Sequence, residues 1–239
     1  MRIAFFSDIH ANREAFDACL AHAQRNGAQR YVFLGDLVGY GADPAYVVDR
    51  VREMVEEGAV CIKGNHDVAA AGGVAENMND YASRAVTWTY DELDDDARAF
   101  LRDLPMSVVE DDRLYVHSEA AKPTEWRYVT DAASAERSLR AAVQRLTFCG
   151  HIHVPQLYHM APMKPAIGFK PQNGAPVPLV ASRKWLMVQG AVGQPRDHNP
   201  AAAYGLLDVK RNEMTYMRAP YDIEAAARKI HAAGLPQLL

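Results

Sequence analysis

The sequence predicts an α/β fold in which parallel strands alternate with helices. Short apolar runs at residues 3–6, 31–34 and 59–62 are separated by two segments whose apolar residues recur at helical spacing. This order implies parallel strands joined by right-handed crossovers, and therefore a sheet with helices packed on it. The 239 residues can bury a large core, and we expect one domain over residues 1–239.

The first half of the chain supplies these elements in order. After the first strand, residues 15–23 form an apolar helical face that closes at Gly27. The second strand leads into a loop with three glycines, and Asp43-Pro44 then indicates an N-cap followed by proline in the first helical turn. That helix ends at Gly58, just before the third strand.

Residues 68–104 are expected to form a small helical cap between strands. Residues 69–73 are small and predict a flexible segment, whereas residues 77–93 and 94–104 have helical patterns. Three aspartates at residues 94–96 favour the positively polarised start of the second helix.

The second half returns to strands. We expect a strand at 113–117, a helix at 131–144 with Leu139, Ala142 and Val143 facing inward, and a strand at 146–149. Residues 155–185 are proline-rich, which predicts an insertion of loops and short edge strands. Three further β-like runs at 185–192, 203–209 and 213–218 are close enough in sequence to be antiparallel neighbours, and an amphipathic helix at 222–233 follows.

Polar side chains recur where these strands end, which core packing does not require. In an open α/β sheet the carboxyl ends of the strands form the ligand-binding edge, so we expect these groups to converge. Imidazole and carboxylate groups without thiolates suit Mn²⁺, Fe, Zn²⁺ or Ni²⁺, and suit Ca²⁺ poorly. Eight groups are too many for one ion but fit two: Asp8, His10, Asp36, Asn65, His66, His117, His151 and His153.

The ordered motifs resemble those of the calcineurin-like metallophosphoesterases. They are Asp8-Ile9-His10, Gly35-Asp36, Gly64-Asn65-His66-Asp67, His117 and Gly150-His151-Ile152-His153. Asn12 and residues 39–41 and 193–197 further resemble a bacterial and archaeal branch of small phosphoesterases that is often labelled diadenosine-tetraphosphatase-like. The resemblance implies a four-layer α/β/β/α sandwich with the site at the sheet edges.

The resemblance also implies a role for each site residue. Asp36 would bridge two metal ions, and His66 would protonate the leaving oxygen or stabilise the phosphoryl group. Asp67 would orient His66. The other ligands would divide into a first set of Asp8, His10 and His153 and a second set of Asn65, His117 and His151.

Substrate contacts leave alternatives open. Arg196 suits phosphate because its guanidinium pairs in a bidentate manner, but a salt bridge within the loop is an alternative. Asn12 could contact substrate or cap a helix, and Tyr40 could stack on a nucleobase or belong to the core. Ser118 and Ala191 stand where relatives commonly have glycine and serine, which bears on substrate placement and not on the metals.

The sequence thus predicts a dinuclear metal-dependent phosphoesterase that uses a metal-bridging hydroxide. The substrate would be a small phosphodiester, phosphomonoester or dinucleoside polyphosphate, and so could be a nucleotide. Manganese is the expected metal, with iron, nickel or zinc as alternatives. A metal-binding scaffold or regulatory protein with weak catalysis is the second hypothesis, which the complete ligand set disfavours.

Composition excludes several other classes. A net charge of −4 and a pI near 6.1 argue against general binding to nucleic acids or anionic membranes. Apolar runs are shorter than the roughly 18 residues of a transmembrane helix, and residues 1–6 are too few for a signal peptide. Three cysteines without paired spacing predict free thiols and a cytoplasmic location. The sequence indicates no oligomeric state.

Overall fold

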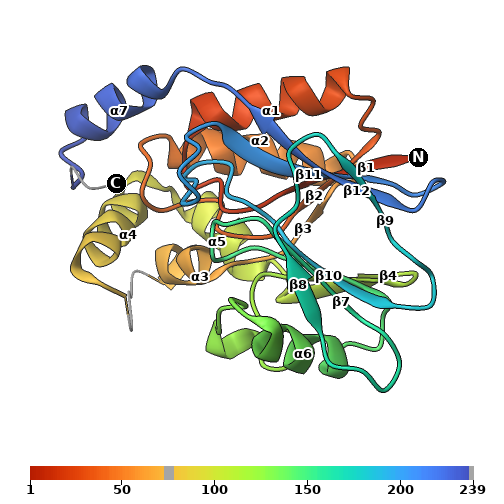
Figure 1. Ribbon diagram of the computed structural model, residues 1–239. Helices are drawn as coiled ribbons and strands as arrows, with labels where there is room; N and C mark the ends of the chain where they lie inside the picture. The colour runs from red at the N-terminus through yellow and green to blue at the C-terminus, as the bar shows by residue number, and fades with distance from the viewer. Residues whose placement is uncertain (73–77, 237–239) are drawn as a thin grey trace.

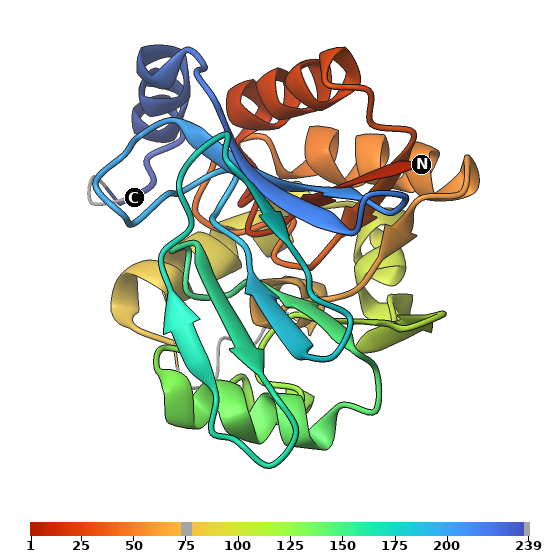
Figure 2. The same ribbon diagram turned by 45° about the vertical axis from the view of Figure 1, so that its right-hand side comes forward.

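Two six-stranded sheets pack face to face, with helices on their outer faces (Figures 1 and 2). The computed structural model of the chain describes residues 1–72 and 78–236. Layers of helix, sheet, sheet and helix confirm the predicted α/β/β/α sandwich.

The first sheet contains the three strands that begin the chain. Its order is β3-β2-β1-β11-β12-β9, and β1–β2 and β2–β3 are parallel pairs, as predicted. The later strands β11 and β12 pair antiparallel and extend the sheet beyond β1. The bounds are β1 Arg2–Phe6, β2 Arg30–Phe33, β3 Val60–Cys61, β9 Pro176–Pro178, β11 Ala202–Asp208 and β12 Glu213–Ala219.

The second sheet has the order β4-β5-β6-β10-β7-β8. The expectation that the run at 185–192 pairs with the run at 203–209 is wrong, because β10 lies in this sheet, parallel to β6 and antiparallel to β7. Fully buried strands are continuous apolar runs, so their sequences do not specify a partner. The bounds are β4 Ser107–Glu110, β5 Arg113–Val116, β6 Leu146–Cys149, β7 Gln156–Met160, β8 Ile167–Phe169 and β10 Lys184–Val188.

Side chains of β1 point alternately to the two faces of the first sheet, so this strand contacts both the second sheet and the helical layer. Ile3 and Phe5 face the second sheet, whereas Ala4 and Phe6 belong to the core beneath the helices. The rings of Phe5 and Phe148 stack with centroids 4.0 Å apart and an interplanar angle of 4°. This contact between β1 and β6 fixes the relative position of the two strands whose ends carry the predicted ligands.

Helices α1 and α2 cover the first sheet, α7 packs on α1, and α6 covers the second sheet (Figure 1). Their bounds are α1 Arg13–Arg25, α2 Pro44–Glu56, α6 Ala132–Ala141 and α7 Ile223–Ala232. Because α6 ends at Ala141, Val143 is 86% exposed and does not face inward as expected. Within residues 1–72 and 78–236, no helix has both the length and the apolar character needed to cross a membrane.

The segment between β3 and β4 forms α3 Asn65–Gly72, α4 Asp80–Glu92 and α5 Asp95–Asp103. Residues 69–72 are helical, so the flexible segment expected there is wrong, while Gly73 and Asn77 lie outside the described residues. Leu101 of α5 joins the core beneath α1 and α2. That residues 68–104 act as a cap stays a prediction.

Residues 155–185 contribute three strands. Two of them, β8 and β9, lie at sheet edges, as proline content predicted. The third, β7, lies between β10 and β8 and is therefore not an edge strand.

Candidate metal centre

Most of the predicted ligands lie just after strand ends, and their own backbone conformation is unusual. A left-handed conformation is uncommon outside glycine, and such strained residues cluster at functional sites. The amide of Asp8 donates to the Gly35 carbonyl oxygen at 3.1 Å, which ties together the loops after β1 and β2. Five ligand residues have positive φ: Asp8 (54°), His10 (49°), Asp36 (53°), His151 (73°) and His153 (61°).

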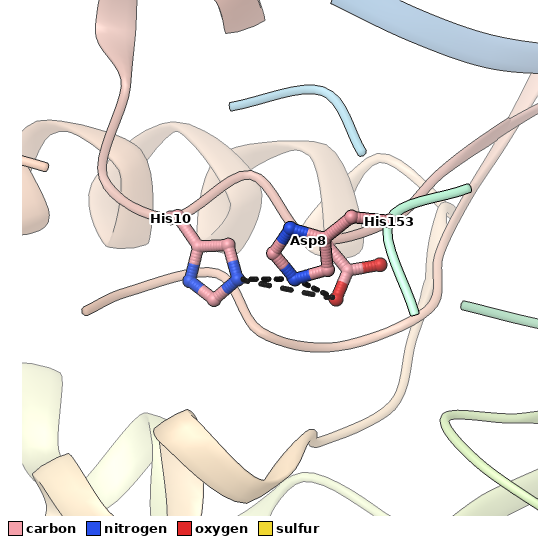
Figure 3. A group of neighbouring side chains, drawn as sticks. All are labelled: Asp8, His10 and His153. Atoms are coloured by element: carbon pink, nitrogen blue, oxygen red, sulfur yellow. Dashed lines mark hydrogen bonds and ion pairs between the residues drawn. The ribbon is translucent and has the colours of Figure 1, made fainter. Parts of the chain in front are cut away.

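Asp8, His10 and His153 form the first cluster (Figure 3). The Nδ1–H groups of His10 and His153 donate to the carbonyl oxygens of Val38 and Gln194, at 3.0 and 2.7 Å. The Nε2 lone pairs of both rings therefore face each other, 3.1 Å apart. Asp8 Oδ1 lies 3.3 Å from His153 Nε2 and has no hydrogen-bond partner among the described residues.

Asp36, His117 and His151 form the second cluster on the same plan. His117 Nδ1–H donates to the Leu34 carbonyl oxygen at 2.7 Å, and His151 Nε2–H donates to that of Trp126 at 2.9 Å. His117 Nε2 and His151 Nδ1 are thereby left to face each other at 3.1 Å.

The Asp36 carboxylate lies between the two clusters. Its Oδ2 is 3.8 Å from His10 Nε2 and 3.3 Å from His117 Nε2. Its Oδ1 accepts the backbone N–H of His66 at 2.9 Å, which fixes the carboxylate. One oxygen of Asp36 is therefore near the ligand atoms of both clusters.

Asn65 begins α3 and borders the second cluster. Its Oδ1 is buried without a hydrogen-bond partner in the described part of the chain. Asn65 and His66 both lie in the first turn of α3.

These atoms fit divalent cations. Facing lone pairs and a bare carboxylate oxygen are unfavourable in a buried site unless a cation lies among them. Backbone carbonyls that accept the distal N–H of each ligand histidine are typical of metal sites. Imidazole and oxygen donors without thiolate match the predicted group of transition metals.

The pKa values of the clustered side chains are shifted by burial and by their charged neighbours. Although burial opposes ionisation, the neighbouring His153 holds the pKa of Asp8 well below its usual range. Burial likewise disfavours a charged His117, but Asp36 raises its pKa to about 9. Burial and the charge on His117 together lower the pKa of His151 to about 4.

His66 lies beside both clusters. One of its ring nitrogens lies within 4.8 Å of candidate ligand atoms of His10 and Asp36. A Cβ on Gly39, whose φ is +85°, would lie 2.5 Å from His66 Nδ1, so glycine leaves room for the ring. Tyr40 covers His66 with ring centroids 4.6 Å apart. Burial lowers the pKa of His66.

Arg196 and Tyr40 lie beside the first cluster. The guanidinium of Arg196 is 5.8 Å from the centroid of the Tyr40 ring and donates to Gln194 Oε1. The alternative of a loop salt bridge is not seen for Arg196 in the described residues, where Asp197 pairs with Arg218 instead. Arg196 is exposed and can reach an anion.

Asn12 caps α1, and its predicted substrate contact stays a prediction. Its Oδ1 accepts from Ala15 N at 3.1 Å, and its Nδ2 donates to the Gly193 carbonyl oxygen at 2.9 Å. Both ends of the amide are therefore occupied, and the N-cap interpretation holds.

The predicted role of Asp67 in orienting the His66 ring has no hydrogen bond to support it among the described residues. Its carboxylate accepts backbone N–H groups of Leu37, Val38 and Gly64, at 2.8, 3.3 and 2.9 Å. The His66 Nδ1 atom has no hydrogen-bond partner in the described residues. Asp67 instead joins the loop after β2 to the start of α3.

The sequence model of a protein family, the calcineurin-like phosphoesterase superfamily domain, matches residues 1–212 of this chain. The chain belongs to this superfamily. Family membership implies divalent metal ions and a hydrolase that acts on phosphoesters, and the two clusters are its candidate metal ligands.

Three proteins match this superfamily member over nearly its whole length. The uncharacterised protein MJ0912 of Methanocaldococcus jannaschii is 30% identical, with 99% of this chain and 95% of that protein covered. The crystal structure of a metallophosphoesterase from Sphaerobacter thermophilus is 32% identical with a TM-score of 0.86, over 100% of this chain and 96% of the other. The hypothetical protein PH1004 of Pyrococcus horikoshii shares the fold, at 19% identity and a TM-score of 0.78 over 99% and 95% of the two chains.

The sequence did not reveal the residues that hold the ligands of this phosphoesterase. Ser7 Oγ donates to Asp8 Oδ2 at 2.6 Å, and the His151 amide donates to the same oxygen at 3.0 Å. A Cβ on Gly150 would lie 1.8 Å from Ser7 Oγ. The only sequence signal was the placement of serine and glycine directly before the ligands Asp8 and His151.

Among the described residues, neither departure from the family pattern has a side chain that hydrogen-bonds to a ligand. Ser118 Oγ donates to the Pro123 carbonyl oxygen at 3.3 Å. Ala191 is fully buried, and its carbonyl oxygen accepts from Ala203 N at 3.0 Å.

Proposed function

We propose that the protein is a dinuclear metal-dependent phosphoesterase. The observation that carries this proposal is the Asp36 carboxylate between two pairs of facing histidine nitrogens. Separate ligand groups around one shared carboxylate are the arrangement of a two-metal site. Asp8, His10, Asp36 and His153 would hold the first ion, and Asp36, Asn65, His117 and His151 the second.

The expected ion is Mn²⁺, with iron, nickel and zinc as alternatives, since the donors are imidazole and oxygen. Bound divalent ions would polarise phosphoryl oxygens and lower the pKa of a coordinated water. The chain itself contributes fixed ligand orientations, because the Val38, Gln194, Leu34 and Trp126 carbonyls hold the four imidazoles.

His66 is the proposed proton donor to the leaving oxygen, or a hydrogen-bond donor to the phosphoryl group. The ring lies beside His10 and Asp36, and its Nδ1 has no partner in the described chain. Tyr40 and Gly39 fix its position. Arg196 would contact a phosphate oxygen beside the first cluster.

The substrate we propose is a small phosphorylated molecule. A phosphodiester, a phosphomonoester and a dinucleoside polyphosphate each fit a site that binds the phosphate by metal ions. Three free, buried cysteines support a reducing compartment such as the cytoplasm.

Metal-stripped protein reloaded with Mn²⁺ tests the proposal. Bis-p-nitrophenyl phosphate, p-nitrophenyl phosphate and diadenosine tetraphosphate would be compared, and metal content measured on the same samples. We expect hydrolysis that Asp36→Asn reduces by at least about 100-fold, because an interaction with both metals is lost. Asp95→Asn, at an exposed position of α5, is the matched control.

His66→Ala separates binding of metal from catalysis. This variant should keep its metal content and lose about 10²–10⁴-fold in rate if His66 acts as the proton donor. Two bound metals without turnover on any of the three substrates would favour the scaffold hypothesis instead. Activity unchanged in Asp36→Asn would contradict the assigned site.

A further inference from the structure

A cavity of about 750 Å³ opens beside the second ligand cluster, and we call it the side cavity. Its volume lies within the roughly 300–1,000 Å³ typical of small-molecule sites. One wall is a face of α3, and the other is the loop before α6. The residues used below are Asn65, Val68, Ala69, Glu125, Trp126 and Tyr128.

The α3 wall follows from helical spacing. Asn65, Val68 and Ala69 are separated by three and four residues, so they lie on one face of the helix. Asn65 is also a candidate metal ligand, which makes the side cavity continuous with the metal centre. Val68 is 43% exposed on this wall, an apolar side chain without a covering partner in the described chain.

The opposite wall is aromatic. The Tyr128 ring stacks on His151, with centroids 4.3 Å apart and an interplanar angle of 19°. Tyr128 is nevertheless 54% exposed. A flat group that enters the side cavity would therefore meet an open aromatic surface next to a candidate metal ligand.

The lining carries little charge. Among the described residues that line it, Glu125 is the one carboxylate, and no lysine or arginine is present. Lys122 and Arg127 pair with that carboxylate, with Lys122 Nζ 2.8 Å from Glu125 Oε1. A chain of phosphates in the cavity would face no lining cation, whereas an uncharged group would bury apolar surface there.

We propose that the side cavity binds a flat, uncharged aromatic group of the phosphoester, either an aryl group or a nucleobase, against Tyr128. The phosphate would then lie at the metal centre, which Asn65 and His151 share with the cavity. This inference rests on the proposed function, since it assigns the organic part of that substrate.

Calorimetric titration of Mn²⁺-loaded protein with phenylphosphonate and methylphosphonate tests the proposal without turnover. Both carry one organic group on a non-hydrolysable phosphorus–carbon bond. We expect phenylphosphonate to bind about tenfold more tightly, the scale of an aromatic stacking contact. Tyr128→Ala should remove this preference and Tyr128→Phe should keep it.

Methylphosphonate serves as the internal control, because its affinity should stay within about twofold in both variants if the metal centre is intact. Val68→Ser removes apolar surface from the opposite wall without adding charge, and it should also weaken only phenylphosphonate. Tyr81→Ala removes a ring of similar exposure, 47%, outside the cavity and should change neither affinity.

Equal affinities for the two phosphonates in the unaltered protein would overturn the proposal, as would a preference that survives Tyr128→Ala. Adenosine 5′-phosphorothioate distinguishes a nucleobase from a small aryl group as the occupant. If it binds more tightly than phenylphosphonate and this binding depends on Tyr128, the occupant is a nucleobase. If it binds more weakly than phenylphosphonate, the occupant is a small aryl group. Tyr128-dependent binding without hydrolysis of any ester would contradict the proposed function alone. Hydrolysis without tighter binding of phenylphosphonate would contradict only the side-cavity assignment.

Discussion

His117 Nε2 lies 3.1 Å from His151 Nδ1, and when both rings are neutral each atom presents a lone pair to the other. The carbonyl oxygens of Leu34 and Trp126 bind the opposite N–H groups, so neither ring can turn away without loss of a hydrogen bond. Unless a metal ion or the proton that the raised pKa of His117 allows lies between them, the fold maintains an unfavourable contact in a buried position. The folded chain is thus arranged to bind positive charge at this point.

Manganese should therefore stabilise the folded protein. A ligand present at 100 times its dissociation constant adds about 2.7 kcal/mol to the free energy of unfolding, and the thermal midpoint should rise accordingly. Thermal unfolding with EDTA and with added Mn²⁺ measures this gain. His151→Ala should reduce it, while exposed His231→Ala should not. No gain up to millimolar Mn²⁺ would argue against a metal site.

Ser7→Ala should weaken metal binding without unfolding the protein. The Ser7 hydroxyl donates to Asp8 Oδ2 and thereby keeps Oδ1 directed at the first cluster. Loss of such a supporting hydrogen bond typically costs 10–100-fold in metal affinity. Titration of the metal-free variant with Mn²⁺ measures the change.

Ser118→Ala is the matched control for this serine. Ser118 is equally buried and adjacent to a ligand, but its hydroxyl donates to the Pro123 carbonyl oxygen instead of a ligand. Its metal affinity should stay within about threefold of the unaltered protein. Equal losses in the two variants would show that Ser7 acts through general packing.

The ligand positions could be predicted because a parallel β-α-β order places every strand end at one edge. Asp8 and Asp36 follow directly from this rule. The task of Asp67 could not be predicted, since it depends on the path of residues 37–38, which has no periodic pattern. The stacking of Tyr128 on His151 likewise joins segments whose sequences do not specify contact.

The pairing of strands in the second half of the chain could not be predicted for a related reason. Residues of β10 are apolar on both faces, so alternation gives neither a direction nor a sheet. Asn12 illustrates a different difficulty, because one residue type serves as helix cap and as substrate contact. The atoms around its amide, from Ala15 and Gly193, show the helix cap, whereas the substrate contact stays a prediction.

Gly150→Ala should destabilise both the fold and the metal site. A Cβ there would lie 1.8 Å from Ser7 Oγ and 2.5 Å from Asp8 Oδ2, and both groups are buried. Overpacking of this kind costs about 1–3 kcal/mol or more in the free energy of unfolding, measured by urea denaturation.

Gly72→Ala is the opposite case at the end of α3. No heavy atom of residues 1–72 and 78–236 lies within 4 Å of the added Cβ, and the backbone is not in the left-handed region. Alanine restricts the unfolded chain and should stabilise the protein by about 0.4–1 kcal/mol. A Gly150→Ala variant as stable as the unaltered protein would contradict the packing described here.

Cys19 should make stability fall with rising pH. The thiol is fully buried in the core beneath α1, and burial raises its pKa well above the ordinary value. In the unfolded chain the thiol loses its proton near pH 8.5, whereas in the fold it stays protonated. The unfolded state then binds fewer protons, so the free energy of unfolding decreases as pH rises through and beyond that value.

Urea denaturation of the unaltered protein and of Cys19→Ala, between pH 6 and pH 10.5, isolates this effect. Other titrating groups are common to both proteins and cancel in the difference. The difference in unfolding free energy should be constant below about pH 8, where the thiol is neutral in both states. Above about pH 9 the advantage of the unaltered protein should shrink by up to about 1.4 kcal/mol per pH unit. A difference that stays constant to pH 10.5 would mean that the folded thiol ionises as readily as the unfolded one.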